Sequence, residues 1–397
     1  MKILVFAPFF PPDPTGSSIF AGQQVRELIR QGHDVLVVTN RADSNAPVAN
    51  ETDDLEAHFG PRKIVRLRSF RVNLGKITWN YGIPVSLVGM LSRIARRTIR
   101  DFVPEAVIVH STLFDLSLIG LVIAKQRHVP SVIVSHTALW HDKWVVNRAM
   151  RTFGRIVLGP AIQRAGAHLV CVDKWTLQNA EGLFGEKFQI STIPVSVELG
   201  QMQGGSGVEI KQRHGISDEP VLLSLGHVVP IRNRVNLTRA LPDLVSRHPR
   251  LRVVIVGMVK DTTFLNLASE LGVLEHIVLA GPVPHSEIRE YLAIADVEAH
   301  DLDGLGLGIT SVEAMDAGVP IVAWSVDDNY PQFSLRGYGP SGFIDDGEPE
   351  TIASKIDEIL TSRDFRDAVV SSQRLLVDDI FSVESVTRQY VSLLQSL

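Results

Sequence analysis

Short, continuously apolar runs recur along this chain, and the intervals between them leave room for helices. In the first half they occupy residues 3–7, 35–39, 106–110, 131–135, 169–172 and 189–193; in the second half, 221–225, 253–257, 277–281, 297–300 and 320–323. Runs without polar alternation are typical of parallel strands covered on both faces by crossover helices. The pattern predicts an α/β protein with two tandem doubly wound Rossmann-like domains and a ligand-binding cleft between them, outside the carboxyl ends of the strands.

The chain has 397 residues, which is long for a single core and favours two domains. Residues 199–207 read Leu-Gly-Gln-Met-Gln-Gly-Gly-Ser-Gly, and such a glycine-rich polar stretch is typical of a boundary. We therefore expect a first domain over residues 1–198, a linker over 199–215 and a second domain over 216–379.

The composition, 45% hydrophobic and 21% charged, is that of an ordinary soluble globular protein. One cysteine, Cys171, excludes an intramolecular disulfide and fits a reducing cytosol. Residues 1–10 indicate a first buried strand rather than a signal peptide, and the longest uncharged apolar run, residues 116–124, is too short to span a bilayer. We expect a cytoplasmic protein, at most peripheral at the inner face of the membrane.

Charge is distributed unevenly along the chain. Residues 1–198 hold 23 Lys and Arg against 16 Asp and Glu, while the remainder holds 16 against 28. Much of the basic excess lies from Arg93 to Arg100 and from Lys143 to Arg155, which either form solvated helix faces or bind an anionic membrane surface. A nucleic-acid partner is disfavoured, because the whole chain is acidic and shows no aromatic platform among its basic residues.

A glycine-rich turn leads into a short helix over residues 304–320, between two apolar runs. Glycines let the backbone approach a bound group, and the following helix start offers free N–H groups and partial positive charge to an anion. The helix carries one acid near its middle, Glu313. Strand, glycine turn, helix and strand form a nucleotide-binding layout, although glycines that only pack a helix on a sheet remain the alternative.

Two further loops follow predicted strands. In residues 11–18, Gly16 and Ser17 could cradle a phosphate before a helix over 19–31; the alternative is a plain turn capped by Ser17 or Ser18. In residues 226–234, Arg232 and Arg234 suit a diphosphate, with His227 as a third donor, unless the arginines merely line a solvated loop.

Four more residues are candidates because of their positions at strand ends. His110 and His136 each close an apolar run, which places them at the carboxyl rim of a parallel sheet, although either could be a satisfied core histidine. Asp301 and Asp303 form an Asp-x-Asp pair that could hold a divalent metal, but such pairs are common by chance. No metal-ligand spacing links the histidines, so we expect no metal.

Together these segments resemble the large family of retaining group 1 glycosyltransferases with the GT-B fold, over nearly the whole chain. The similar segments are the opening strand with Gly16, Ser135-His136-Thr137, residues 170–195, Gly306-Leu-Gly-Ile309 and Glu313-Ala-Met-Asp-Ala-Gly-Val-Pro320. The resemblance implies a C-terminal helix over 380–397 that crosses back onto the first domain.

The resemblance also implies roles for individual residues. Glu313 matches the acid that binds the nucleotide ribose, and His136 the histidine beside the donor sugar. The turn and helix start that would face the diphosphate and sugar comprise Gly306, Gly308, Ile309 and Thr310. His227 and Arg232 fall where the family has an Arg and a Lys that bind phosphate.

Two departures from the family pattern stand out. Leu305 occupies the position of the first acid of a paired-glutamate motif, so Asp303 or Asp301 could act in its place. Residues 326–329, Val-Asp-Asp-Asn, replace the usual glycine pair.

The implied reaction moves a hexosyl unit, with retention, from a nucleoside-diphosphate sugar to a saccharide or lipid-linked acceptor in cell-envelope polysaccharide or glycolipid synthesis. It needs no cofactor beyond the sugar nucleotide. His136, Arg232 and Asp303 would be catalytic, and His110 would lie on the acceptor side. The alternatives are a nucleotide-sugar-binding pseudoenzyme, a sugar-nucleotide epimerase and a phosphorylase, although no segment suggests the lysine site that a phosphorylase needs.

Overall fold

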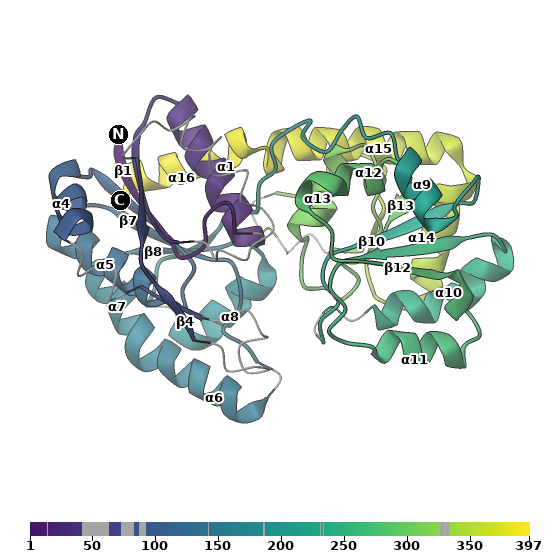
Figure 1. Cartoon of the computed structure of the whole chain (residues 1–397), viewed down its shortest axis with the longest axis horizontal. Helices are drawn as coiled ribbons and strands as arrows, with labels where there is room; N and C mark the ends of the chain where they lie inside the picture. The colour runs from purple at the N-terminus through teal and green to yellow at the C-terminus, as the bar shows by residue number, and fades with distance from the viewer. Residues whose placement is uncertain are drawn as a thin grey trace. The chain divides into compact units, whose positions relative to one another are not determined.

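A computed structural model describes residues 1–13, 15–41, 63–72, 83–86, 93–141, 143–185, 187–230, 232, 234–325, 330 and 333–397. The chain divides into two compact units (Figure 1). Unit 1 contains Met1–Pro194 and Val386–Leu397, and unit 2 contains Val195–Ser385. The departure at residues 326–329 lies outside the described residues.

Unit 1 is built on a seven-stranded parallel sheet with the order β3-β2-β1-β6-β7-β8-β9. Its strands are β1 (Lys2–Ala7), β2 (Asp34–Asn40), β3 (Ile64–Leu67), β6 (Ala106–His110), β7 (Ser131–Ser135), β8 (His168–Cys171) and β9 (Ile190–Thr192), with a separate antiparallel pair, β4 (Phe70–Val72) and β5 (Ile83–Val85). Its helices are α1 (Gly16–Arg30), α4 (Arg93–Phe102), α5 (Asp115–Arg127), α6 (Trp144–Phe153), the π-helical turn η2 (Gly154–Leu158), α7 (Gly159–Ala165), α8 (Lys174–Phe184) and α16 (Val383–Ser396).

Helices cover both faces of this sheet, which explains why its strands are apolar throughout. Helices α4, α5, α7 and α8 pack on one face, where Phe6 and Val109 belong to the core. Helices α1 and α16 lie on the other face (Figure 1), and their fully buried rings, Phe20 and Tyr390, have centroids 6.3 Å apart. Cys171 is buried in this core, and burial raises the pKa of its thiol to about 12, so it is an inert packing residue.

Unit 2 contains a four-stranded parallel sheet with the order β12-β11-β10-β13 and a parallel pair, β14 and β15. Its strands are β10 (Val221–Leu225), β11 (Arg252–Val256), β12 (Ile277–Gly281), β13 (Val297–Glu298), β14 (Ala323–Trp324) and β15 (Phe343–Ile344). Its helices are α9 (Val208–His214), α10 (Val235–Arg247), α11 (Thr263–Glu270), η3 (Leu274–His276), η4 (His285–Glu287), α12 (Ile288–Leu292), α13 (Ile309–Asp316), α14 (Pro349–Thr361), α15 (Arg363–Leu376) and η6 (Val377–Phe381).

Both sheets are α/β and doubly wound, as the apolar runs predict. In unit 1 the first strand, β1, lies between β2 and β6. In unit 2 the first strand, β10, lies between β11 and β13. The strand order reverses there, and the carboxyl edge at such a switch point is where doubly wound sheets bind ligands.

The expected linker differs from what the structure shows, because residues 199–215 lie inside unit 2. Helix α9 buries Ile210 in that unit's core, and the backbone N–H groups of Ser206 and Gly207 donate to the Glu290 carboxylate. The division falls after Pro194 rather than after residue 198, and the tail of unit 1 starts at Val386 rather than at residue 380. Glycine content therefore marked a surface loop of unit 2 and not a linker.

Candidate functional site

In unit 2, polar side chains gather at the carboxyl ends of β10 and β13. Arg232 follows β10, and its Nη1 lies 3.0 Å from Oδ1 of Asp301, which follows β13. A Cβ added to Gly308 would lie 2.8 Å from that same Nη1, so only glycine lets the guanidinium lie this close to the start of α13. The turn before it includes Gly304 and Gly306, both at positive φ. The glycine turn predicted from the sequence thus leaves room for the Arg232 guanidinium at the start of α13.

Asp301 connects this cluster. Its Oδ2 accepts hydrogen bonds from the Gly308 N–H at 2.6 Å and from the Ser311 hydroxyl at 2.7 Å. Burial alone would raise the pKa of Asp301, but Arg232, His300 and these two donors together hold it below its usual range. A carboxylate of the protein itself therefore occupies part of the positive helix start that was expected to face a diphosphate. The next N–H groups of the first turn, those of Ile309 and Thr310, lack intrahelical acceptors by helix geometry.

Asp303 lies two residues away in a contrasting environment. Burial raises its pKa to about 6, against the opposing effects of Arg232 and Arg234 and with a smaller contribution from the Asp301 charge. A carboxyl group with this pKa changes protonation near neutral pH, which suits proton handling. Within the described part of the chain, no three His, Cys, Asp or Glu side chains come together as metal ligands.

Arg234 has a different role from the expected phosphate fork. It adopts a left-handed backbone conformation at the N-cap of α10, and its buried Nη2 donates to the carbonyl oxygens of Leu225 and Gly226 at 2.9 and 3.1 Å. Burial lowers its pKa to about 10, although Glu298 and Asp301 oppose this shift. The guanidinium holds the strand-end loop in shape.

A buried chain of polar groups connects β13 to α13, and the sequence interpretation missed it. Nδ1 of His300 lies 2.6 Å from Oε1 of Glu298, which also accepts from the Leu225 N–H, and Nε2 of His300 lies 3.1 Å from the Thr310 hydroxyl. Glu298 and His300 are fully buried or nearly so. In the predicted strand over 297–300, an acid and a histidine two residues apart would share one face, and that spacing is the signal that could have revealed them.

Glu313 is buried on α13, and its Oε1 lies 2.7 Å from Nε2 of His285. His227 lies in the loop after β10, where its Nδ1 accepts from the Met258 N–H at 3.1 Å. Burial, then Lys260 and Arg234, lowers the pKa of His227. A neutral His227 at pH 7 is a hydrogen-bonding group rather than a cation in place of the family's arginine.

In unit 1, the two predicted histidines lie together. Nδ1 of His110 is 3.1 Å from Nε2 of His136, and the rings stack with centroids 5.3 Å apart and Phe20 edge-on to both. Burial lowers the pKa of His136 to about 4, and burial and then His136 lower that of His110 well below its usual range. Both rings are therefore neutral at pH 7. Since Nε2 of His136 lies against His110, Nδ1 is the nitrogen left for other partners.

The loop after β1 leads into α1, which begins at Gly16. The helix is capped by Thr15, whose Oγ1 accepts from the Ser18 N–H at 3.3 Å, so the alternative in which Ser17 or Ser18 caps the helix is wrong. The Ser17 hydroxyl lies 3.3 Å from that of Thr15. Gly16 is exposed in the first turn, and its N–H is among those that a helix leaves without an intrahelical acceptor.

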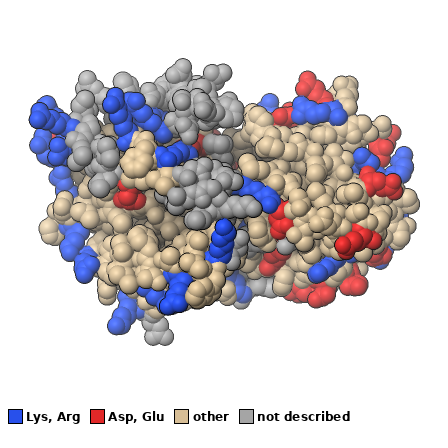
Figure 2. All heavy atoms as spheres, turned by 60° about the horizontal axis from the view of Figure 1, so that its bottom comes forward, with Lys and Arg blue, Asp and Glu red and all other residues tan. Residues whose placement is uncertain are grey.

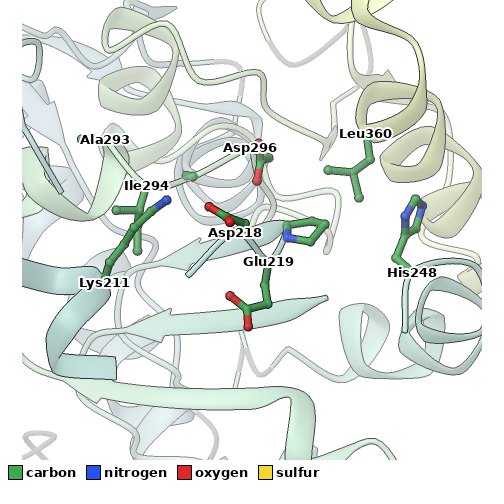
Figure 3. Close-up of a pocket in the computed structure, with 10 residues that line it drawn as sticks. Lys211, Asp218, Glu219, His248, Ala293, Ile294, Asp296 and Leu360 are labelled. Carbon is green, nitrogen blue, oxygen red and sulfur yellow. The ribbon is translucent and has the colours of Figure 1, made fainter. Parts of the chain in front are cut away.

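Unit 2 also has a cavity of about 390 Å³ at the opposite, amino edge of its sheet (Figure 3). Its polar groups are bonded to their own surroundings: Nζ of Lys211 donates to the Ser217 carbonyl, Asp296 accepts from the Val221 N–H, and His248 lies 2.8 Å from an Asp357 oxygen. The cavity shares no lining residue with the strand-end cluster. We therefore place the candidate site at the carboxyl edge.

Family models match both units. The model described as glycosyl transferase 4-like domain matches residues 15–195, and that described as glycosyl transferases group 1 matches residues 208–375. These two matches together leave only the termini and a short segment around residue 200 uncovered.

Among characterised proteins, the chain is 31% identical over 249 residues to the GDP-mannose-dependent alpha-(1-6)-phosphatidylinositol monomannoside mannosyltransferase of Mycolicibacterium smegmatis, covering 60% of this chain and 62% of that protein. The match thus spans less than two thirds of that relative. A D-inositol 3-phosphate glycosyltransferase of Acidothermus cellulolyticus is 25% identical over 365 residues, covering 88% of this chain and 78% of that protein.

Solved structures share the fold along the whole length. Anabaena HepE, in complex with UDP and glucose, has a TM-score of 0.68 at 16% identity, covering 100% of both chains. WaaG, a glycosyltransferase involved in lipopolysaccharide biosynthesis, has a TM-score of 0.62 at 15% identity with the same coverage. With a family model matched to each unit, the chain belongs to the group 1 glycosyltransferases of the GT-B fold.

Proposed function

We propose that this chain is a retaining glycosyltransferase that moves a hexosyl unit from a nucleoside-diphosphate sugar to a saccharide or lipid-linked acceptor in cell-envelope glycan synthesis. The observation that carries the proposal is the cluster at the carboxyl edge of unit 2, where Arg232 lies beside the start of α13 and Glu313 is on the same helix. The names of the mannosyl- and inositol-phosphate-acting relatives support the envelope context.

Donor binding follows from the charges of this cluster. A diphosphate at the start of α13 would meet the N–H groups of Ile309 and Thr310 and the guanidinium of Arg232, all donors suited to phosphate oxygens. Glu313 would accept from the ribose hydroxyls. Its contact with His285 holds one carboxylate oxygen at 2.7 Å and so fixes the direction of the other.

The chemistry we propose is mostly positioning and charge stabilisation. As the sugar–phosphate bond breaks, negative charge grows on the diphosphate, and Arg232 together with the helix start would stabilise it. The departing phosphate would take the acceptor's proton on the same face of the sugar, so no protein nucleophile is needed. Asp303 is our candidate for the acid that the family pattern places at Leu305, and neutral His136, with Gly16 and Ser17, is proposed to act on the donor.

A pseudoenzyme is the second candidate, and one observation favours it. Asp301 already engages Arg232, whose guanidinium a diphosphate would use, and the Gly308 N–H at the same helix start. If the Asp301 carboxylate stays bound to these donors when a nucleotide is present, nucleotides would bind weakly and turnover would be absent.

A thermal-shift panel of nucleoside diphosphates and their sugars tests donor binding, because a ligand that binds only the folded state raises its apparent stability. We expect Glu313→Ala to weaken the binding of whichever nucleotide produces a thermal shift by about 1.5–3 kcal/mol, the range for a hydrogen bond to a charged group. Glu313→Gln keeps the shape and tests the charge, and Glu270→Ala, at an exposed end of α11, is the matched control. Hydrolysis of a donor sugar separates the enzyme from the pseudoenzyme, and unchanged affinity in both Glu313 variants would contradict the ribose assignment.

A further inference from the structure

The outward face of α6 and η2 carries large apolar side chains in water. Trp144 is 69% exposed, Val145 69%, Ile156 68% and Val157 40%. Single exposed apolar residues are ordinary on protein surfaces, but four at the two ends of one continuous helical segment form a pattern. We call Trp144, Val145, Arg148, Ala149, Thr152, Arg155, Ile156 and Val157 the α6–η2 face, since these residues are exposed along one segment.

Packing on the other side of the segment fixes this face outward. Met150 and Phe153 lie against the unit 1 core, and Gly154 and Leu158 are buried. A Cβ added to Gly154 would lie 3.1 Å from Leu139 and 3.7 Å from Leu183, so the helix sits close to its neighbours. These contacts hold the η2 end of the segment against the core, and Met150 and Phe153 are the partly buried residues of α6 that pack there.

The same face, together with Lys143 just before α6, is cationic. Residues 143–172 contain no Asp or Glu, whereas Lys143, Arg148 and Arg155 are all exposed. The Arg148 guanidinium lies 5.4 Å from the centre of the Trp144 ring, which holds a cation beside an aromatic side chain. On the face drawn in Figure 2, Lys and Arg gather over unit 1 while Asp and Glu gather over unit 2.

The other basic segment predicted from the sequence is α4, and none of its described apolar side chains is exposed. Arg93, Arg96 and Arg97 are exposed there, but Ala95 and Ile99 are buried in the core. Asp101, at the end of the same helix, lies 3.4 Å from Arg97 and 3.2 Å from Arg100 and offsets part of its charge. The described side chains of α4 therefore form a solvated basic face with local ion pairs.

We propose that the α6–η2 face docks unit 1 on an anionic lipid bilayer. Trp144, Val145 and Ile156 would insert at the boundary between headgroups and acyl chains, where tryptophan is favoured. Lys143, Arg148 and Arg155 would meet the lipid phosphates, as in interfacial helices with a basic and an apolar component. No helix among the described residues is long and apolar enough to cross a membrane.

This inference deepens the proposed function, since it supplies a surface on which a lipid-linked acceptor would be met. The experiment uses the full chain and vesicles of phosphatidylcholine with or without 30% phosphatidylglycerol, in a flotation assay at 50 and 500 mM NaCl. We expect binding to the anionic vesicles at low salt, at least ten-fold weaker binding at high salt, and little binding to neutral vesicles.

Two variants locate the contact. Trp144→Ser with Ile156→Ser should reduce binding at least ten-fold, and Arg148→Gln with Arg155→Gln should reduce it several-fold and flatten the salt dependence. Val122→Ser, which removes an apolar side chain that is 51% exposed on α5, should bind as the unchanged chain does. The thermal shift with nucleotides reports on unit 2 and should be the same in all variants. If no nucleotide produced a thermal shift while the chain still bound vesicles, the proposed function would be overturned and the docking proposal would stand.

Three results would overturn the docking proposal. One is the absence of binding to anionic vesicles at 50 mM NaCl. Another is equal binding by the Trp144→Ser, Ile156→Ser variant. The third is a dimer in light scattering that this variant abolishes, which would make the α6–η2 face an interface between two copies.

Discussion

Arg232 and Asp301 form an ion pair of 3.0 Å between the loops that follow β10 and β13, the two strands at the switch point of unit 2. The same carboxylate accepts from Gly308 and Ser311 at the start of α13. One buried acid therefore holds an arginine and a helix start together where a donor diphosphate is proposed to bind. The first predictions below therefore concern Asp301 and its neighbour Asp303.

Asp301→Asn should destabilise the chain. The substitution leaves Arg232 without its 3.0 Å carboxylate partner and weakens two charge-assisted hydrogen bonds, and breaking a buried pair costs about 3–5 kcal/mol. Because the Arg232 side chain is 25% exposed, we expect a smaller loss of about 2–3 kcal/mol, at or just below the lower end of that range. Urea unfolding at pH 7 measures the loss. A change within error of zero would mean that the pair contributes no net stability.

Asp303→Asn, by contrast, should raise the free energy of unfolding at pH 7. The folded-state pKa of about 6 lies above the ordinary value of 3.8, so stability falls as pH rises from 4 to 6, and the full penalty remains above pH 6. Two pKa units correspond to about 3 kcal/mol at most. The variant should be more stable than the unchanged chain at pH 7 and equal to it near pH 4. Urea midpoints at both pH values give the comparison, and a pH-independent difference would contradict it.

The same variant tests the role of Asp303 in turnover. If Asp303 replaces the acid missing at Leu305, Asp303→Asn should lower kcat for donor hydrolysis at least ten-fold, about 1.4 kcal/mol of barrier, despite its higher stability. Adding Leu305→Glu should restore part of the rate, because it returns an acid to the family's position. Leu305→Glu alone is the control. Unchanged kcat in Asp303→Asn would remove Asp303 from the mechanism.

The His110–His136 pair should make unit 1 sensitive to acid. Both folded-state pKa values lie below the ordinary value of 6.5, that of His136 at about 4, so the unfolded chain binds more protons between these pH values. Stability is fully present above pH 6.5 and is lost as pH falls toward 4, by about 3 kcal/mol from His136 alone. His136→Gln should flatten the pH dependence of the urea midpoint in this window. His128→Asn, at an exposed helix end, is the matched control for replacing a histidine.

Local sequence patterns determined the architecture. Uninterrupted apolar runs such as 106–110, 131–135 and 221–225 became strands with those bounds, because a strand covered on both faces needs apolar residues at every position. The glycine turn before α13 was equally readable, since Gly304 and Gly306 adopt positive φ there. Shorter elements were not: β3, β14 and β15 were missed or misplaced, because edge and two-residue strands lack a distinct pattern.

Only the tertiary structure decided which side chains meet. Three contacts join segments that are distant in sequence. Asp301 pairs with Arg232, Glu313 contacts His285, and His110 stacks on His136. The same holds for exposure: both basic segments looked alike in sequence, yet α4 buries Ala95 and Ile99 while the α6–η2 face leaves Trp144 and Ile156 in water. A sequence records periodicity and composition locally. Pairing and burial arise only when separate elements pack, and here they set the chemistry.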